Sequence, residues 1–189
     1  MEDKPLEGKT IAIMVGNGFD EFSFTESQKL STKFGASFLV VSKSSGLVNG
    51  WYKGNWGHFF PVDFDLANTL AVDYHGLIIP GGIRSINEMA EDPQAKRNLK
   101  AFLRAQMPVA LIGDALKLLL ISEDAKGRSV TGVPEFEDLL TESDAKSCDE
   151  KVVVDDNLVT GRASDSIHET FKEFMELVVK YDGEIIEAA

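Results

Sequence analysis

The sequence predicts a doubly wound α/β fold, in which helices cover both faces of a mostly parallel sheet. Three observations predict it: short apolar runs of strand length, intervening segments with apolar residues at helical spacing, and glycine turns after three of the apolar runs. Strands that alternate with helices form right-handed β-α-β units, and these units place the strands parallel in one sheet.

The first half of the chain supplies two of the strands and a small hairpin. Residues 10–15 are a continuous apolar run, which is typical of a central strand that is buried on both faces. Residues 23–34 are expected to form a helix that ends at Gly35, and residues 37–41 are expected to form the next strand. Residues 47–63 are rich in glycine and aromatic side chains, which indicates a small β-hairpin added beside the main sheet.

The second half continues the alternation and ends with a hairpin and a helix. Two more strands are expected at residues 77–79 and 109–112, with a helix at residues 92–106 between them. A further, shorter helix follows the second of these strands. Two apolar runs on either side of residues 155–157 predict a hairpin, and the clean helical spacing of residues 165–180 predicts the last helix.

The composition is that of an acidic globular chain. Its 189 residues suit a single domain over residues 1–189, and 31 acidic against 19 basic residues give a net charge of −12. A surface with this charge repels phosphate backbones and anionic lipids, so we expect no nucleic-acid partner and no membrane partner. With Cys148 as the single cysteine, an internal disulfide framework is excluded and a cytoplasmic location is expected.

The glycine turns are the predicted location of function, because ligands of doubly wound sheets bind beyond the carboxyl ends of the strands. The turns lie at residues 16–21, 80–84 and 113–116. The first begins like a dinucleotide loop, but Phe19 and the two acids after it would put bulk and negative charge where a pyrophosphate sits. The three histidines are scattered, with no spacing typical of a metal site. We therefore expect neither a cofactor nor a metal.

Four motifs occur in an order and spacing that are specific when taken together. They are Gly-Phe-Asp-Glu at residues 18–21, the aromatic segment at residues 50–63, Pro-Gly-Gly at residues 80–82 and the hairpin at residues 152–160. These motifs resemble the ThiJ/PfpI superfamily, and its PfpI branch in particular. The resemblance implies a flavodoxin-like fold of the class I glutamine amidotransferase type. It also implies dimers or higher oligomers and the activities of intracellular proteases or amidases, glyoxalases and the parkinsonism-associated deglycase.

The sequence departs from this family at its catalytic positions. Active members carry a cysteine nucleophile on the sharp turn after the fourth strand, commonly in the run Ile-Cys-His-Gly-Pro. In this chain the cysteine position is Gly113 and the histidine position is Asp114. The acid that the family places near the thiol falls at Ser23, and the acid after the glycine loop falls near Asn87. A glycine cannot act as a nucleophile, and it relieves the backbone strain that a cysteine bears at such a turn.

The run Gly-Asp-Ala at residues 113–115, followed by Lys117, also resembles the carboxy-terminal domain of large-subunit catalases, which lacks the nucleophile as well. The resemblance therefore implies a family member without the thiol chemistry. Cys148 is remote in sequence from the turn, and we interpret it as an incidental thiol rather than a relocated nucleophile.

Several side chains in these turns are candidates for a pocket. Asp114 is interpreted as a helix N-cap, with a general base or nucleophile as the alternative, in which Asp20 and Glu21 would join it. The 80–82 loop resembles the oxyanion side of the family's site, although a tight turn after a buried strand needs the same glycines. The candidate pocket residues are Asp20, Glu21, Gly81, Gly82, Asn87, Asp114 and Ala115.

The hairpin carries more aromatic surface than its small size requires. Aromatic side chains are enriched at interface hot spots, and in the resembling proteins this region lies near subunit contacts. A homo-oligomer interface is predicted here, with burial within one chain as the alternative. The candidate interface residues are Trp51, Tyr52, Trp56, Phe59 and Phe60.

Two functions are compatible with these residues. The first is a non-catalytic, stress-associated or ligand-binding homo-oligomer that keeps the fold with an altered pocket. The second is a hydrolase or lyase of the protease, amidase, glyoxalase or deglycase type that acts on small carbonyl or amide compounds through carboxylates. The simultaneous loss of the nucleophile, its histidine and the acid favours the first.

Overall fold

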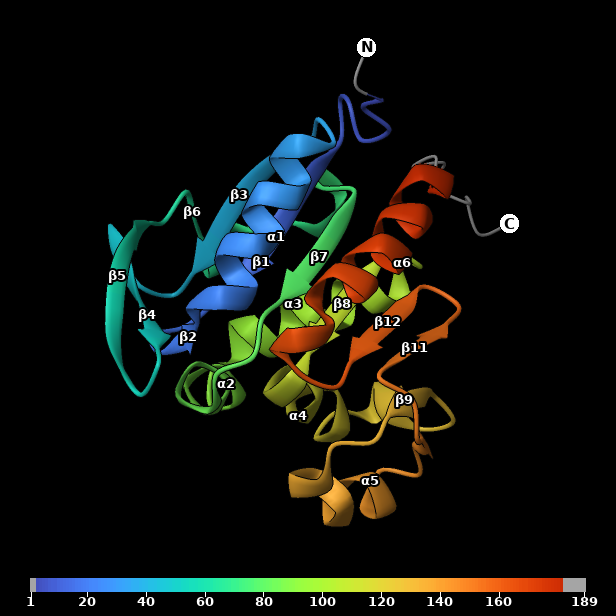
Figure 1. The fold of residues 1–189 in the computed structure, drawn as a ribbon. Helices are drawn as coiled ribbons and strands as arrows, with labels where there is room; N and C mark the ends of the chain where they lie inside the picture. Colours follow the sequence, from blue (N-terminus) through green and yellow to red (C-terminus); the bar gives the residue numbers. More distant parts are fainter. Residues whose placement is uncertain (1–2, 182–189) are drawn as a thin grey trace.

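The computed structural model describes residues 3–181 and confirms the doubly wound α/β architecture (Figure 1). Its main sheet has seven strands. In order across the sheet they are β11 (Val152–Asp155), β12 (Leu158–Gly161), β8 (Val109–Ile112), β7 (Gly76–Ile79), β1 (Thr10–Met14), β3 (Ser37–Ser42) and β6 (Phe64–Asp65). Each neighbouring pair runs parallel except β11 and β12, which form the predicted antiparallel hairpin.

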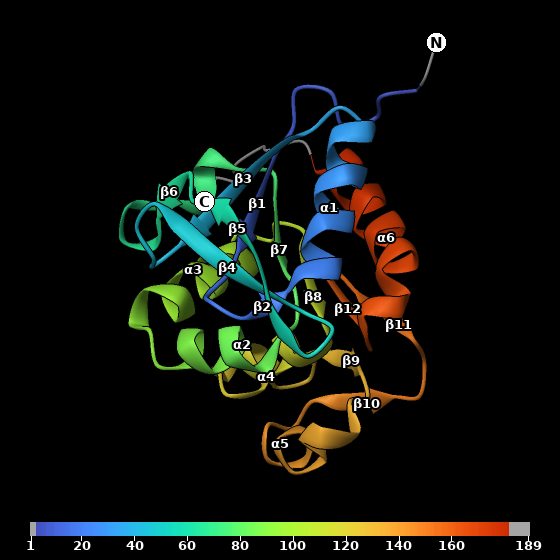
Figure 2. The same cartoon turned by 60° about the vertical axis from the view of Figure 1, so that its left-hand side comes forward.

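Helices cover both faces of this sheet. The α-helices are α1 (Glu21–Lys33), α2 (Ile83–Ala90), α3 (Pro93–Arg104), α4 (Leu116–Leu120), α5 (Glu137–Glu142) and α6 (Ile167–Lys180). The 3₁₀ helices are η1 (Leu66–Asn68), η2 (Ala71–Asp73), η3 (Gly113–Ala115), η4 (Glu123–Ala125), η5 (Pro134–Phe136) and η6 (Ser164–Ser166). α1 and α6 lie side by side on one face, and α2, α3 and α4 lie on the other (Figure 2). Within residues 3–181, every helix is too short or too polar to cross a membrane.

Alternate residues of the central strand β1 supply the two apolar cores. Ile11 and Ile13 belong to the core beneath α1 and α6, whereas Ala12 and Met14 belong to the core beneath α3. All four side chains are buried. Because both faces of the strand are covered, its sequence is a continuous apolar run rather than an alternating one.

The predicted aromatic hairpin forms a separate sheet beside the main one (Figure 2). This sheet contains β2 (Phe19–Asp20), β4 (Leu47–Tyr52) and β5 (Asn55–Pro61). Lys53 (φ 47°) and Gly54 (φ 81°) make the two-residue turn between β4 and β5, and both adopt the positive φ that such turns require. β2 pairs in parallel with β4, so the hairpin is attached to the chain just before α1.

Several elements were not predicted from the sequence. They include β2, the run from β6 to η2, and α2, which begins directly after the glycine loop. They also include the segment 122–150, which contains α5 and the parallel pair β9 (Ser129–Thr131) and β10 (Lys146–Cys148). α2 has eight residues, α5 has six and each strand has three. Elements this short do not complete enough periods for hydrophobic spacing to identify them.

Candidate functional site

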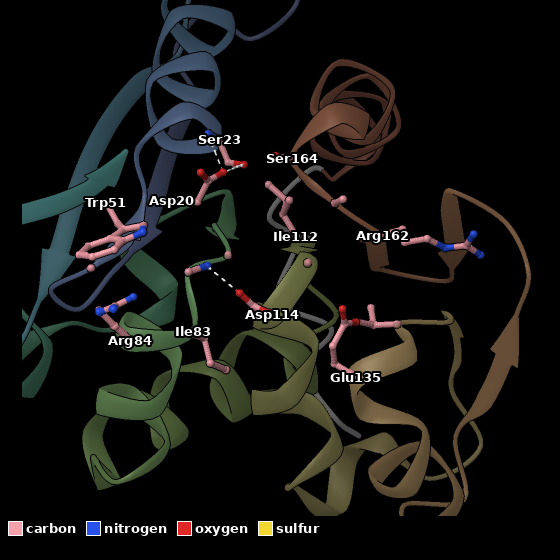
Figure 3. A pocket seen from close by; sticks show the side chains of 16 residues that line it. Asp20, Ser23, Trp51, Ile83, Arg84, Ile112, Asp114, Glu135, Arg162 and Ser164 are labelled. Carbon is pink, nitrogen blue, oxygen red and sulfur yellow. Dashed lines mark hydrogen bonds between the residues drawn. The ribbon is translucent and has the colours of Figure 1, made fainter. Parts of the chain in front are cut away.

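A pocket of about 450 Å³ opens at the carboxyl edge of the sheet, where the loops after β1, β7 and β8 meet (Figure 3). This is the position predicted from the three glycine turns. The loops bring together the candidates Asp20, Gly81, Gly82 and Asp114. The other residues of the wall that matter here are Ser23, Trp51, Arg84, Gly113 and Glu135.

The turn after β8 is formed by a glycine in the left-handed conformation. Gly113 has φ +56° and begins η3, which continues into α4. A Cβ at this position would lie 3.7 Å from the carbonyl oxygen of Arg162, its nearest neighbour. There is space for a side chain, and only the backbone conformation disfavours one. The pocket wall at the family's nucleophile position is therefore bare backbone.

The Asp114 carboxylate links two of the loops. Its Oδ2 accepts a hydrogen bond from the Gly82 N–H at 3.2 Å (Figure 3). The predicted N-cap role is wrong for the helix that contains Asp114, because neither η3 nor α4 has a side-chain cap. Gly82 is the N-cap residue of α2, so the carboxylate lies at the start of a neighbouring helix instead. Backbone N–H groups and the helix dipole stabilise negative charge there.

Burial raises the pKa of the Asp114 carboxyl group above its ordinary value, because a charged carboxylate is poorly solvated in this wall. The hydrogen bond from the Gly82 N–H acts in the opposite direction. The carboxylates of Glu135 and Asp20 raise the same pKa further. The pocket therefore carries an acid that holds its proton more tightly than an exposed aspartic acid does.

Asp20 is the N-cap residue of α1. Its Oδ2 accepts the Ser23 N–H at 3.1 Å and the Ser23 hydroxyl at 2.5 Å. Ser23 is buried and contributes to the pocket wall. Ser23, at the family's acid position, thus takes part in the start of α1, and its hydroxyl group donates its hydrogen bond to Asp20.

The loops after β1 and β7 are in direct backbone contact. The Asp20 N–H donates to the Gly81 carbonyl oxygen at 2.8 Å. Gly82 has φ +105°, and a Cβ at this position would lie 2.5 Å from the carbonyl oxygen of Gly18. A residue with a side chain at position 82 would force these loops apart. This close approach accounts for the glycine without any role for it in catalysis.

Glu21 points into the hairpin and not into the pocket, so its prediction as a pocket residue is wrong. Its Oε1 lies 2.5 Å from His58 Nδ1, and its Oε2 accepts the His58 N–H at 2.9 Å. The carboxylate fills a slot between Gly50 and Gly57, where a Cβ on either glycine would collide with it. The reason for the error is geometric: the first residue of α1 faces β4 and β5, whereas Asp20 before it faces the sheet edge.

Two other candidates also lie outside the pocket wall. Asn87 accepts a hydrogen bond from Lys117 Nζ at 2.8 Å, in an exposed contact between α2 and α4. The unpredicted helix α2 carries Asn87 away from the pocket toward α4. Ala115 is buried in the apolar core beneath α3 because the 3₁₀ turn at η3 directs it inward. The prediction of both residues as pocket residues is wrong.

The structure adds a cation and a carboxylate that sequence reasoning missed. The Arg84 guanidinium carbon lies 3.7 Å from the centre of the Trp51 ring, in a cation–π contact. Arg84 is the last residue of the predicted turn at residues 80–84, and that position was the signal that could have identified it. Glu135 in η5 gave no such signal, because it reaches the pocket only through the fold of the unpredicted segment 122–150.

The aromatic residues of the hairpin divide into covered and exposed members. Trp51 is half-buried and forms part of the pocket wall. Phe60 is half-buried and packs against the core, with its ring centre 4.6 Å from that of Phe24, and its place in an interface stays a prediction. The exposed members are Tyr52, Trp56 and Phe59.

The single thiol lies outside this pocket. Cys148 is half-buried at the end of β10 and lines a different hollow. In the part of the chain that the structure describes, residues 3–181, His, Cys, Asp and Glu side chains form no group of three that could hold a metal ion. The pocket itself is lined by carboxylates, backbone amides, the stacked guanidinium of Arg84, and Arg162, which pairs with Asp149.

The sequence of this chain matches a known protein family over most of its length. The model of the DJ-1/PfpI family matches residues 9–177, a range that includes every wall residue discussed above. This chain belongs to the DJ-1/PfpI family. An uncharacterized protein of Staphylococcus aureus, SAV1875, is 28% identical over 170 residues, which cover 89% of this chain and 97% of that protein.

Solved structures of the DJ-1/PfpI type share the fold. A ThiJ/PfpI domain protein from Brachyspira murdochii superimposes with a TM-score of 0.78 and 25% identity, over 93% of this chain and 96% of that one. A two-domain protein from Anabaena variabilis, with DJ-1/ThiJ/PfpI-like and ferritin-like domains, gives a TM-score of 0.82 at 19% identity. This match covers 89% of the present chain and 49% of the two-domain chain. The flavodoxin-like fold implied by the sequence motifs is confirmed.

Replacing Gly113 by alanine is expected to lower the free energy of unfolding by about 1–2 kcal/mol, the cost of a left-handed conformation for a residue with a Cβ. Gly113→Asn is expected to cost less, because asparagine adopts this conformation more readily. Urea denaturation followed by circular dichroism measures both changes. If the alanine variant is as stable as the unmodified protein, residue 113 does not adopt the left-handed conformation described here.

Proposed function

We propose that this member of the DJ-1/PfpI family binds a small molecule in the pocket and performs no thiol chemistry there. The observation that carries the proposal is the turn at residues 113–114, where a bare glycine precedes a carboxylate that is hydrogen-bonded to Gly82. By resemblance, the active members of the family place their cysteine at the first of these positions and a histidine at the second. The pocket persists here with different chemistry in its wall.

The hydrogen bond between Gly82 and Asp114 supports the proposal in a second way. The glycine loop resembles the side of the family's site that holds an oxyanion. In this chain the Gly82 N–H already donates to a carboxylate, so a substrate oxyanion would have to displace Asp114 and then lie beside it. Two like charges about 4 Å apart repel by roughly 1 kcal/mol in water and roughly 4 kcal/mol near a protein surface. The altered wall therefore opposes the intermediate that the family's chemistry needs.

A second candidate function is a hydrolase or lyase that uses the Asp114 carboxyl group. The raised pKa of Asp114 favours it, because a carboxyl group that retains its proton can serve as a general acid. Asp20 lies in the same wall, although Ser23 occupies one of its oxygens. Glu21 takes no part, since its carboxylate is held in the hairpin slot.

Conversion of methylglyoxal to lactate by the purified protein separates these two candidates. We expect a rate equal to that of boiled protein, both for the unmodified sequence and for Asp114→Asn. The reason is that the turn at residues 113–114 carries no thiol and that the Gly82 N–H already donates to the Asp114 carboxylate. Lactate formation is measured enzymatically after incubation with millimolar methylglyoxal.

The control variant is Asp138→Asn, an exposed carboxylate on α5 outside the pocket. A general acid or base contributes about 10²–10⁴-fold to a rate. Turnover that falls by this factor in Asp114→Asn and stays unchanged in Asp138→Asn would contradict the proposal and support the carboxylate enzyme.

We also propose that the protein forms a homo-oligomer through the aromatic hairpin. Tyr52, Trp56 and Phe59 are 44%, 54% and 65% exposed, although each is a large side chain that gains free energy on leaving water. Aromatic side chains are enriched at the hot spots of protein interfaces. A second copy of this chain is the occupant that the family resemblance implies.

Sedimentation velocity at micromolar concentration is expected to show a dimer or a larger assembly. Phe59→Asp should shift the protein toward the monomer, because it places a charge in the interface. The matched control is Val72→Asp in η2, which changes an apolar residue that is 74% exposed but lies outside the hairpin. A strict monomer for the unmodified protein, or equal effects of the two substitutions, would rule out this interface.

A further inference from the structure

We infer that the pocket takes a small zwitterion of amino-acid size, with its carboxylate at Arg84 and its ammonium group between Asp114 and Glu135. This inference rests on the proposed binding function and specifies its ligand. Figure 3 shows Arg84 beneath the Trp51 ring on one side of the pocket and Glu135 on the other, with Asp114 between them. Arg84 and Glu135 therefore place opposite charges on facing walls of one cavity. Arg162 also belongs to the wall on the Glu135 side, but its side chain points away from the pocket and pairs with Asp149 at 2.8 Å.

The Arg84 guanidinium is held in an orientation that can bind a carboxylate. The contact of its guanidinium with the Trp51 ring at 3.7 Å fixes the guanidinium plane and leaves N–H groups at its edge for other partners. Among residues 3–181, Arg84 makes no ion pair within 4.0 Å. A planar guanidinium binds a carboxylate through two parallel hydrogen bonds, so the group matches this part of a ligand in both charge and shape.

Asp114 and Glu135 form the complementary side. Asp114 uses Oδ2 for the Gly82 N–H, and within the described chain its Oδ1 has no hydrogen-bond donor. Glu135 likewise has no ion-pair partner there. The two carboxylates repel one another, which contributes to the raised pKa of Asp114. An ammonium group between them would remove this repulsion and supply the donors that both carboxylates lack.

The charges and the size of the pocket disfavour dianions, dications and large ligands. A dianion would meet the carboxylates on one side, and a dication would meet Arg84 on the other. The volume of about 450 Å³ lies in the lower half of the range for small-molecule sites, about 300–1,000 Å³. Ile83, Ile112 and Val133 supply apolar surface in the same wall, which suits a short aliphatic side chain.

Three probes of nearly the same shape test the assignment. L-Leucine carries both charges, isopentylamine carries only the ammonium group, and 4-methylpentanoate carries only the carboxylate. Titration of the full chain, followed through the backbone amide NMR signals of Gly82 and Gly113, gives a Kd for each probe. We expect leucine to bind about tenfold more tightly than either partial probe, as the loss of one charge-assisted hydrogen bond predicts.

Two variants identify which wall binds which group. Arg84→Gln should weaken leucine binding about tenfold and leave isopentylamine binding unchanged, which also shows that the variant is folded. Glu135→Gln should weaken the binding of leucine and isopentylamine but not of 4-methylpentanoate. Asp138→Asn, outside the pocket, should change none of the three.

The possible failures are distinguishable. A partial probe that binds as tightly as leucine would overturn the zwitterion and leave small-molecule binding in place. The absence of any shift with all three probes at millimolar concentration would also overturn the inference. Methylglyoxal turnover tests the non-catalytic proposal separately, because that assay requires no binding of these probes.

Discussion

The hydrogen bond from the Gly82 N–H to Asp114 Oδ2 joins the loops that follow the neighbouring parallel strands β7 and β8, and the form of the pocket depends on it. Parallel strands end at the same edge of a sheet, so these loops meet without any long connection. The bond holds the start of α2 against the start of η3. It also determines the chemistry of the pocket, because it occupies a backbone donor that a substrate oxygen would need. Gly113, the residue before Asp114, contributes no side chain. The loop contact and the proposed loss of thiol chemistry therefore both arise from the turn at residues 113–114.

Close backbone approach is the second constraint, and it connects the hairpin with the pocket. Gly82 allows the loops after β1 and β7 to touch, while Gly50 and Gly57 leave room for the Glu21 carboxylate. The adjacent residues Asp20 and Glu21 therefore have different structural roles. Asp20 caps α1 at the pocket wall, and Glu21 fixes the hairpin on the other side of the same helix start. The hairpin carries Trp51 into the pocket wall. The position of the Trp51 ring therefore depends on the Glu21 carboxylate, although Glu21 itself lies outside the pocket.

The sequence alone predicted the central sheet and the identity of the glycine turns, because buried parallel strands are continuous apolar runs and their ends converge by topology. It also placed Gly113 and Asp114 at the turn after the fourth central strand. It did not predict α2 or the segment 122–150, whose elements are too short for periodicity to identify. Glu135 was missed for that reason, whereas Arg84 lies in the predicted turn at residues 80–84 and was not singled out among its residues. Glu21 was wrongly predicted to line the pocket, because adjacent residues at a helix start point in different directions. The sequence does not show which of Asp20 and Glu21 points toward the pocket.

Titration of the Gly82 amide signal by ¹⁵N NMR tests the central claim most directly. Burial raises the pKa of Asp114, so the folded protein holds this proton to a higher pH than the unfolded chain does. We predict that the Gly82 signal moves with a midpoint above the ordinary pKa of an aspartic acid, about 3.9, and that Asp114→Asn abolishes the movement. A Gly82 signal that is indifferent to pH, or that titrates equally in Asp114→Asn, would contradict a pocket in which this carboxylate occupies the backbone donor.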